Sequence, residues 1–382
     1  MATSVLKSAR PADDYYVPDF RVEVEGAVLD AEAHGDVLEL KVVMDMDNMT
    51  SFDFTINNWD DKTVSFKYSD TDTFNVGNSV HVLMGYAGKL LPMVTGQIAT
   101  MSPHFPESGP STLTVGGLDG MFRLRDRKPA EGEVTKYRNM ADWQIAEAVA
   151  QRNGLKSKVT REGQVYDEIV QKNQDDATFL MERAKRIDFD CYVRTDPGTG
   201  EGVLHFEKPT DGRDSSVIRV YQFIWGENLV SFNPTINLSR QVGKITVRGW
   251  NDRTKQAIVA TAEAKDLPKA GKTQGGKSGP EAVEKSMEGK HEVVVDVPIN
   301  SEEEARWLAN ALLAERAEQF ITGTGQAIGL PDLRPGDNVE MKGLGERFDG
   351  PYYVTKVEHV INESGYRTQF DVRRLYDGIQ PI

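Results

Sequence analysis

An excess of acidic residues sets the first limits on this chain of 382 residues. It carries 59 Asp and Glu against 45 Lys and Arg, a formal net charge of −14. Nucleic acid is therefore not expected as its main partner, because phosphate binding needs a basic surface. No apolar run approaches the roughly 20 residues of a membrane span, and no hydrophobic signal core is recognisable. The single cysteine, Cys191, precludes an intrachain disulfide and indicates synthesis in a reducing cytoplasm.

The first part of the chain predicts an arm followed by β-strands. Residues 1–18 end at a proline and have the character of a flexible N-terminal arm. Apolar and charged residues then alternate from Phe20 to Val28, and similar strand patterns occupy Val37–Met44 and Ser51–Ile56. With the strands expected within residues 74–118, they predict a first β domain.

The turn between two of these strands contains a partial calcium-loop pattern. Asp45 and Asp47 have the spacing of the first two ligands. The third ligand position is Met49 and the position that requires glycine is Thr50, so we predict no metal site there.

Helical periodicity begins near Met140 and predicts an α+β insertion. One helix is expected to end at Gly154, a suitable C-cap, and a second to begin at Asp176, a suitable N-cap. The second helix leads into the alternating strand Phe189–Val193, which includes Cys191. A thiol in such a strand should be buried and unreactive, because a reactive thiolate needs a positive, partly exposed setting.

Strand patterns resume in the second half and predict a second β domain. They lie at Val217–Ile224, Leu229–Phe232 and Val242–Trp250. The composition then changes, since Ala264–Lys290 is rich in Lys, Gly, Glu and Ser with almost no large apolar residue. Such a segment cannot bury enough surface to offset its ordering, so we predict a mobile loop.

Order is expected to return with a helix. Ser301 and Glu304 form a capping box, and acidic residues suit the positive end of a helix. The helix should continue to Phe320 and pack its Leu308 and Leu312 face on the second β domain.

The predicted mobile loop contains a phosphate-loop pattern. Gly271–Ser278 satisfies G-x-x-x-x-G-K-S. That chemistry needs a buried strand before the loop and a helix after it. Lys265–Lys269 is not a buried strand pattern, and Gly279-Pro280 follows with no amphipathic helix expected. We interpret the segment as a linker, with nucleotide binding as the alternative.

Two stretches far apart in the chain echo each other. Phe74–Val80 and Leu333–Val339 each place a glycine before two polar residues and a valine. Further on, Thr95–Ile98 echoes Asp349–Tyr352. One interpretation is an internally duplicated β-barrel. The other is that turns and strands recur by chance in any β protein.

No constellation of catalytic residues stands out. There is no G-x-S-x-G elbow, and the histidines show no metal-ligand spacing such as H-E-x-x-H. Three Asn-x-Ser/Thr triplets, at Asn48, Asn237 and Asn362, are interpreted as chance matches. We therefore predict no catalytic, cofactor-binding or metal-binding residues and a protein that is not an enzyme. The six histidines are His34, His81, His104, His205, His291 and His359.

Five stretches in order resemble the late-control D family of phage tail proteins, which shares its hub domain with VgrG proteins. The resemblance extends over about residues 19–375, and no single motif in it is specific. The stretches that carry it are residues 40–59, residues 74–126 with their G-x-x-V, G-Y and G-x-I series, residues 174–206, residues 229–250 and residues 330–374.

The resemblance implies a structural protein. Hubs of this family form homotrimers in which each subunit contributes two tail-tube-type barrels, so six similar barrels adapt a sixfold inner tube to a threefold spike. The implied partners are the inner tube or a tube-initiator protein, the spike and the baseplate wedge. The implied location is the baseplate of a contractile phage tail or injection system, after synthesis in the cytoplasm. An effector-bearing VgrG-like protein with hydrolase activity is the alternative, and it would need a further domain.

The sequence thus predicts a mainly β, α+β protein with two tube-type barrels and an insertion. The expected parts are an N-terminal arm (1–18), a first barrel (19–126), an α+β insertion domain (127–210), a second barrel (211–264 and 290–375, with a helix at 301–320), a flexible loop (265–289) and a C-terminal tail (376–382).

Overall fold

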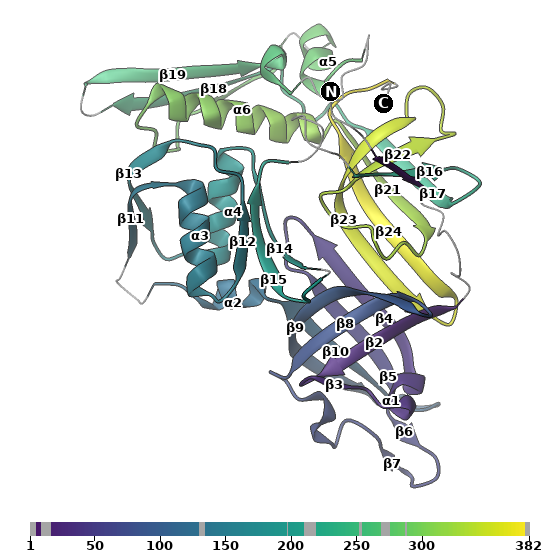
Figure 1. Cartoon of the computed structure of the whole chain (residues 1–382). Helices are drawn as coiled ribbons and strands as arrows, with labels where there is room; N and C mark the ends of the chain where they lie inside the picture. Colours follow the sequence, from purple (N-terminus) through teal and green to yellow (C-terminus); the bar gives the residue numbers. More distant parts are fainter. Residues whose placement is uncertain are drawn as a thin grey trace.

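The computed structural model is mainly β, as predicted (Figure 1). None of the helices among the residues it describes has the length and apolar character needed to cross a bilayer. The described residues are 5–8, 17–129, 134–196, 198–209, 219–251, 254–268, 276–286 and 289–378.

Six strands from the first part of the chain lie side by side, and we call them the N-terminal strand set. Their inner side chains alternate with outer ones, as in β4, where Leu40, Val42 and Met44 are buried. These residues belong to a core that β4 shares with β5, β8 and β10. In spatial order the set is β2 (Pro18–Val24), β8 (Ser79–Tyr86), β9 (Lys89–His104), β10 (Thr112–Asp119), β5 (Ser51–Asn57) and β4 (Val37–Asp45).

The C-terminal strand set repeats this order with six later strands around a core of its own. Each strand occurs in the same sequence order as its counterpart. The two sets differ in the direction of their first strand: β2 runs antiparallel to β8, whereas its counterpart β16 runs parallel to β22. In spatial order the set is β16 (Arg219–Ile224), β22 (Asn338–Lys342), β23 (Gly350–Asn362), β24 (Gly365–Arg374), β21 (Ile321–Ile328) and β17 (Leu229–Ile236).

One strand pair joins the two sets into a single sheet of 14 strands. Antiparallel β4 and β23 pair from Asp45 opposite Lys356 to Glu39 opposite Asn362. The sheet also includes β3 (Ala27–Val28) beside β2 and β1 (Val5–Ser8) beside β16. The prediction of a flexible arm is therefore wrong for β1, whose backbone pairs in parallel with the C-terminal set.

The glycines predicted to echo each other occupy equivalent places. Gly77 has φ +95° and its N–H donates to Ile98 O, while Gly336 has φ +87° and donates to Val354 O. A positive φ is the conformation that glycine adopts without a Cβ penalty. The hydrogen bonds correct the second echo, because Ile98 is equivalent to Val354 and not to Tyr352.

Two β-bulges also recur at equivalent places. Ala99 is the extra residue of β9 against β10, as Thr355 is of β23 against β24. Leu38 is the extra residue of β4 against β5, as Val230 is of β17 against β21. Bulges fix register and bend strands, so the shared positions mark a duplicated arrangement that the alternative of chance does not account for.

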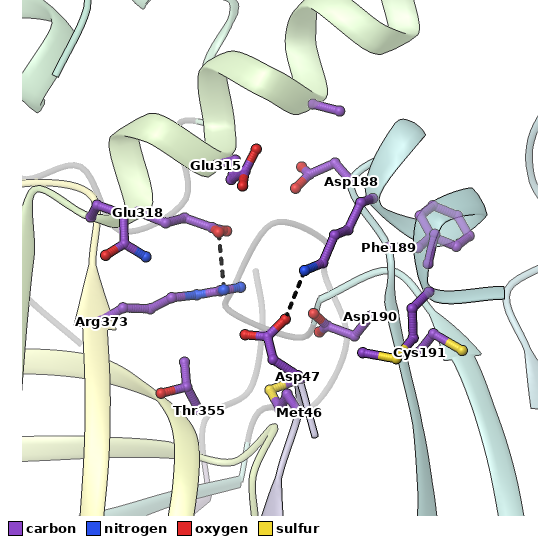
Figure 2. Close-up of a pocket in the computed structure, with 15 residues that line it drawn as sticks. Met46, Asp47, Asp188, Phe189, Asp190, Cys191, Glu315, Glu318, Thr355 and Arg373 are labelled. Carbon is purple, nitrogen blue, oxygen red and sulfur yellow. Dashed lines mark ion pairs between the residues drawn. The ribbon is translucent and has the colours of Figure 1, made fainter. Parts of the chain in front are cut away.

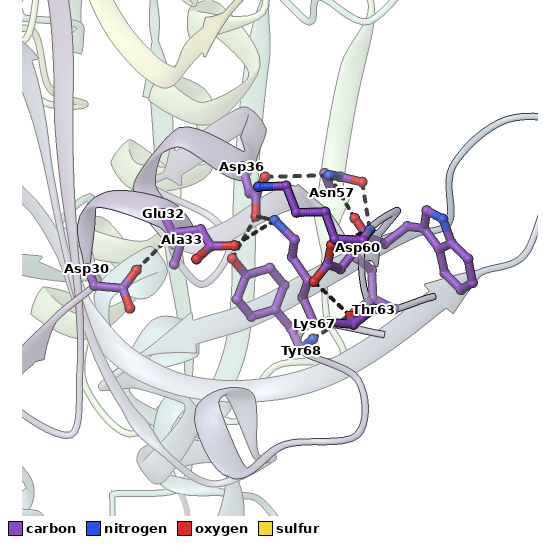
Figure 3. Close-up of polar contacts among 12 residues, drawn as sticks. Asp30, Glu32, Ala33, Asp36, Asn57, Asp60, Thr63, Lys67 and Tyr68 are labelled. Carbon is purple, nitrogen blue, oxygen red and sulfur yellow. Dashed lines mark hydrogen bonds and ion pairs between the residues drawn. The ribbon is translucent and has the colours of Figure 1, made fainter. Parts of the chain in front are cut away.

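A polar cluster holds α1 (Ala31–Asp36) on the end of the N-terminal set (Figure 3). The Asp36 carboxylate accepts hydrogen bonds of 2.8 Å from both Lys67 Nζ and Tyr68 OH. The hydrogen bond to Asp36 raises the pKa of the Lys67 amino group above its ordinary value. Around it lie the short pair β6 (Trp59–Asp60) and β7 (Ser65–Phe66) and the 3₁₀ turn η1 (Asp72–Phe74).

An α+β region lies between β10 and β16, with its own hydrophobic core. Cys191 is buried in it, and burial raises the pKa of its thiol to about 12, in agreement with the prediction of an unreactive thiol. The elements are α2 (Met121–Asp126), β11 (Thr135–Ala141), α3 (Asp142–Arg152), β12 (Lys156–Val159), β13 (Val165–Gln171), α4 (Asp176–Arg186), β14 (Asp190–Thr195) and β15 (Gly202–Glu207).

A second inserted region, which we call the α6 module, lies between β17 and β21. Its three strands form a separate sheet, so the assignment of residues up to 264 to the second barrel is wrong for this part. The long helix α6 packs on that sheet, and both contribute to a fourth core. The elements are β18 (Lys244–Asn251), β19 (Gln256–Glu263), η2 (Ala264–Asp266), α5 (Gly279–Ser286), β20 (His291–Val294) and α6 (Glu302–Glu318).

Two details of the α6 module correct the sequence prediction. Leu308 and Leu313 are buried, at 5% and 0% exposure, whereas Leu312 is only partly buried. The predicted loop 265–289 also contains α5, whose Val283 is fully buried. Residues 269–275 and 287–288 of that loop lie outside the described residues.

Candidate functional site

The partial calcium-loop pattern lies at a pocket of about 130 Å³ between α4, α6 and the C-terminal strand set (Figure 2). Asp47 is 3.1 Å from Lys185 Nζ, and its backbone N–H donates to Asp45 Oδ1. Across the pocket Arg373 lies 3.0 Å from Glu318. Within the described residues no group of His, Cys, Asp or Glu has the geometry to hold a metal ion. The two ion pairs at this pocket link segments that are far apart in the chain, Asp47 to Lys185 and Glu318 to Arg373.

The phosphate-loop pattern does lead into a helix, so the expectation of none was wrong. Its backbone amides, however, already bind carboxylates. Lys277 N donates to Asp377 Oδ1 at 2.7 Å, and Ser278 N donates to Glu281 Oε2 at 3.1 Å. Two of the amides that phosphate binding would use thus already donate to carboxylates, whose charge would repel an anion. This arrangement favours a structural interpretation of Lys277 and Ser278.

A buried polar cluster lies where the two strand sets meet, around the turn that precedes β22. Arg334 is 5% exposed. Its guanidinium donates to Leu333 O at 2.9 Å and, across the junction, to Pro92 O at 3.1 Å. Burial lowers the pKa of this group to about 10, so it stays charged at neutral pH. The arginine therefore ties the turn of one set to β9 of the other.

His359 completes this cluster from β23. Its Nε2 lies 3.2 Å from Leu333 O, which can only accept, so Nε2 carries the proton and Nδ1 accepts from Tyr366 OH at 2.9 Å. Burial lowers the pKa of the imidazole to about 3. The ring is thus a neutral group whose two nitrogens hold neighbouring parts of the chain together. Tyr86 OH, which donates to Gly329 O at 2.8 Å, adds another bond between the sets.

The other histidines are dispersed over the structure. His205 is buried and its Nδ1 lies 2.7 Å from Glu207, whereas His81 is near Glu23 at 3.4 Å. His34 stacks on Phe20 with ring centroids 4.3 Å apart, and His291 lies 3.7 Å from Glu284. The structure does not bring the histidines together.

Two strand edges are the features that the sequence analysis missed. In the described part of the chain, Thr100–His104 of β9 pairs only with β10. The β17 ladder likewise involves only β21, apart from one isolated bridge at Leu229. Each open edge carries a proline, Pro103 and Pro234. A proline within a strand pattern signals an edge position, so that signal was available in the sequence.

The fold is that of phage tail proteins. A tail protein of 43 kDa from a prophage of Shewanella oneidensis has a TM-score of 0.66 at 15% identity, and the match covers 94% of this chain and 98% of that one. A tail protein from Neisseria meningitidis gives 0.66 and 15%, covering 94% and 97%. A protein of Escherichia coli described as a component of the type VI secretion system gives 0.60 and 12%, covering 94% and 79%.

The family follows from the sequence. The chain belongs to the family described as the Alg8 N-terminal domain, whose model matches residues 15–363. No curated protein sequence matches it. The resemblance to late-control D proteins stays a prediction, since the matching model has a different description.

Proposed function

We propose that this chain is a structural hub in the baseplate of a contractile phage tail or injection system. Three copies would form a ring that joins the sixfold inner tube, or a tube-initiator protein, to a threefold spike, with baseplate wedge proteins around it. In this proposal the chain has no catalytic role and binds neither cofactor nor nucleic acid.

The observation that carries the proposal is the duplicated strand set. Two sets with the same strand order, the same two bulges and the same glycine turn give each chain two similar units. Three chains then present six similar units, which matches both symmetries at once, since closed rings fix the number of copies. The likeness to tail proteins along nearly the whole chain agrees with such a role.

A reconstruction of the assembled particle tests the proposal. We expect three copies on the central axis, between the tube and the spike. Six copies of the chain, or a position away from the axis, would contradict it.

A further inference from the structure

The sheet of the α6 module has one covered face and one open face. On the covered face Ile245, Val247 and Ala262 are fully buried against α6. Helix α6 in turn lies between this sheet and helix α4 of the α+β region (Figure 1). The side chains that alternate with the buried ones therefore point away from α6, and we call this surface the outer module face. It consists of Thr246, Arg248 and Trp250 of β18, Ala257, Val259 and Thr261 of β19, and Val293 of β20.

The outer module face is apolar for an exposed sheet surface. Trp250 is 52% exposed, Val259 50% and Val293 52%. In the strand register Val259 lies beside Arg248, and Val293 lies beside Thr246. The solvent side of an antiparallel sheet is ordinarily polar, as it is on β5, where every outer side chain is polar. Apolar side chains that gather on an open surface mark a contact with another molecule.

The charges on this side of the sheet are paired at one end and unpaired in the middle. Near α5, Glu263 lies 3.2 Å from Lys244 Nζ and 3.0 Å from Lys265 Nζ. Arg248, which is exposed among the apolar side chains, has no carboxylate within ion-pair distance in the part of the chain that the structure describes. The outer module face therefore presents a positive charge inside an apolar surface.

This combination limits what can cover the face. A guanidinium that is buried without an anion costs several kcal/mol, because an unpaired charge loses its hydration. Whatever packs on the apolar side chains has therefore to bring an anion to Arg248. A nucleic acid does not suit the site, because a lone arginine on a chain of net charge −14 does not make a phosphate-binding surface. A protein carboxylate beside apolar side chains suits both parts of the face.

We propose that the outer module face is a docking site for a protein segment in which an Asp or Glu lies between apolar side chains. The carboxylate binds the Arg248 guanidinium, which favours bidentate contacts with carboxylates. The apolar neighbours pack on Trp250 and Val259. Tryptophan and arginine are the residues that most often dominate the binding energy of a protein interface. The site lies outside both strand sets, so the inference goes beyond the proposed hub function and does not depend on it.

Peptide selection on the whole folded chain tests this site. A displayed library of random peptides is selected on the chain, and peptides that also bind the double variant Arg248→Ala/Trp250→Ser are removed. The remaining peptides should carry an Asp or Glu flanked by apolar residues. Both substituted side chains are exposed, so the variant should unfold at the same denaturant concentration as the wild type.

Affinity measurements then assign the contacts. The best selected peptide, labelled with fluorescein, is the probe in anisotropy titrations. Trp250→Ser and Arg248→Ala should each weaken its binding at least about tenfold. Trp225→Ser removes a similarly exposed tryptophan from the end of β16 and is the matched control, with an expected change of less than about twofold. Arg248→Glu should bind only the peptide whose acidic residue is replaced by lysine, because the two charges are then exchanged.

The outcomes separate this site from other occupants and from the hub itself. Selected peptides without an acidic residue, or a probe that binds Arg248→Ala and Trp250→Ser as tightly as the wild type, would overturn the proposal. A native mass that shows association of the wild type but not of Trp250→Ser would assign the face to a second copy of the chain instead. The number of copies in the assembled particle is measured separately, so failure of this site would leave the hub proposal standing.

Discussion

The two strand sets have the same strand order but differ in the side chains that fill their hydrophobic cores. In the N-terminal set Phe54 of β5 lies opposite Val115 of β10. At the equivalent pair of the C-terminal set, Gly325 of β21 lies opposite Phe370 of β24. A Cβ on Gly325 would lie 2.3 Å from the Phe370 ring, so the glycine makes room for it. The aromatic ring comes from opposite strands in the two sets, which shows that the duplicated form depends on combined volume rather than on residue identity.

The sets differ also in the length of the segment between the two strands of their first antiparallel pair. Between β4 and β5 there is only the turn of residues 46–50, whereas the α6 module fills the equivalent interval between β17 and β21, residues 237–320. An insertion of this size is tolerated because the entropic cost of closing a loop grows slowly with its length. The module also has a core of its own, separate from that of the strand set, so we expect it to be stable independently of the strand set.

The largest expected effect tests this independence. Leu313→Asp places a charge in the fully buried core of the module and should cost about 5 kcal/mol there, since it loses apolar burial and leaves a carboxylate unpaired. Leu312→Asp, at a partly buried position, is the matched control and should cost much less. Hydrogen exchange should lose protection in residues 237–320 while β8 and β9 keep theirs. Equal loss in the N-terminal set would contradict a separate core.

The second prediction tests whether a pair of core side chains from the C-terminal set can replace the equivalent pair in the N-terminal set. Phe54→Gly removes a fully buried ring and should lower the free energy of unfolding by about 4 kcal/mol. Val115→Phe in that background imitates the Gly325 and Phe370 pair and should recover about 1 kcal/mol or more, because both changes share one space. Denaturant unfolding measures both. Additive losses in the double variant would show that the two interiors are not interchangeable.

The third prediction uses the pH dependence of stability to distinguish the two sets. His359 of the C-terminal set titrates, whereas its counterpart in the N-terminal set, Pro103, does not. The folded chain holds the pKa of His359 at about 3, below the usual value near 6.5. Below pH 6.5 the His359 imidazole binds a proton in the unfolded chain but stays neutral in the folded chain. The free energy of unfolding should therefore fall by about 1.4 kcal/mol per pH unit, or about 2 kcal/mol at pH 5.

His359→Gln keeps hydrogen-bonding groups and should remove this slope. Asp119 acts in the opposite direction, because burial raises the pKa of its carboxyl to about 7. The difference between wild type and variant cancels that contribution, since Asp119 is present in both. An unchanged slope in His359→Gln would assign the acid sensitivity to other groups.

The smallest change in stability is expected for a substitution at Lys277, in the α6 module, which has no counterpart in the N-terminal strand set. Lys277→Ala should change the free energy of unfolding by less than about 0.5 kcal/mol, because Lys277 binds Asp377 through its backbone N–H and its backbone carbonyl, which the substitution keeps. Isothermal titration with ATP should detect no binding to either form. Micromolar affinity that this substitution abolishes would restore the nucleotide-binding alternative.

The sequence by itself determined the local structure. Alternation placed β4 and β5, and the positive-φ turns at Gly77 and Gly336 were recognisable from their neighbours. Ser301 is the N-cap, as predicted, since Glu304 N–H donates to Ser301 Oγ at 3.0 Å; the second bond of the capping box differs, because the Glu304 carboxylate accepts from Asn300 N–H at 2.9 Å. These features depend on contacts between residues close in the chain, so a short stretch is enough to specify them.

Only the tertiary structure decided which strands lie side by side. β17 and β18 have similar alternating patterns, but one joins the large sheet and the other belongs to the α6 module. Arg334 has the polarity of a surface residue and is buried because Pro92, from a distant strand, supplies an acceptor. Strand order and the burial of charge depend on partners far apart in sequence. A pattern read along the chain specifies which face of a strand is apolar but not which strand will cover it.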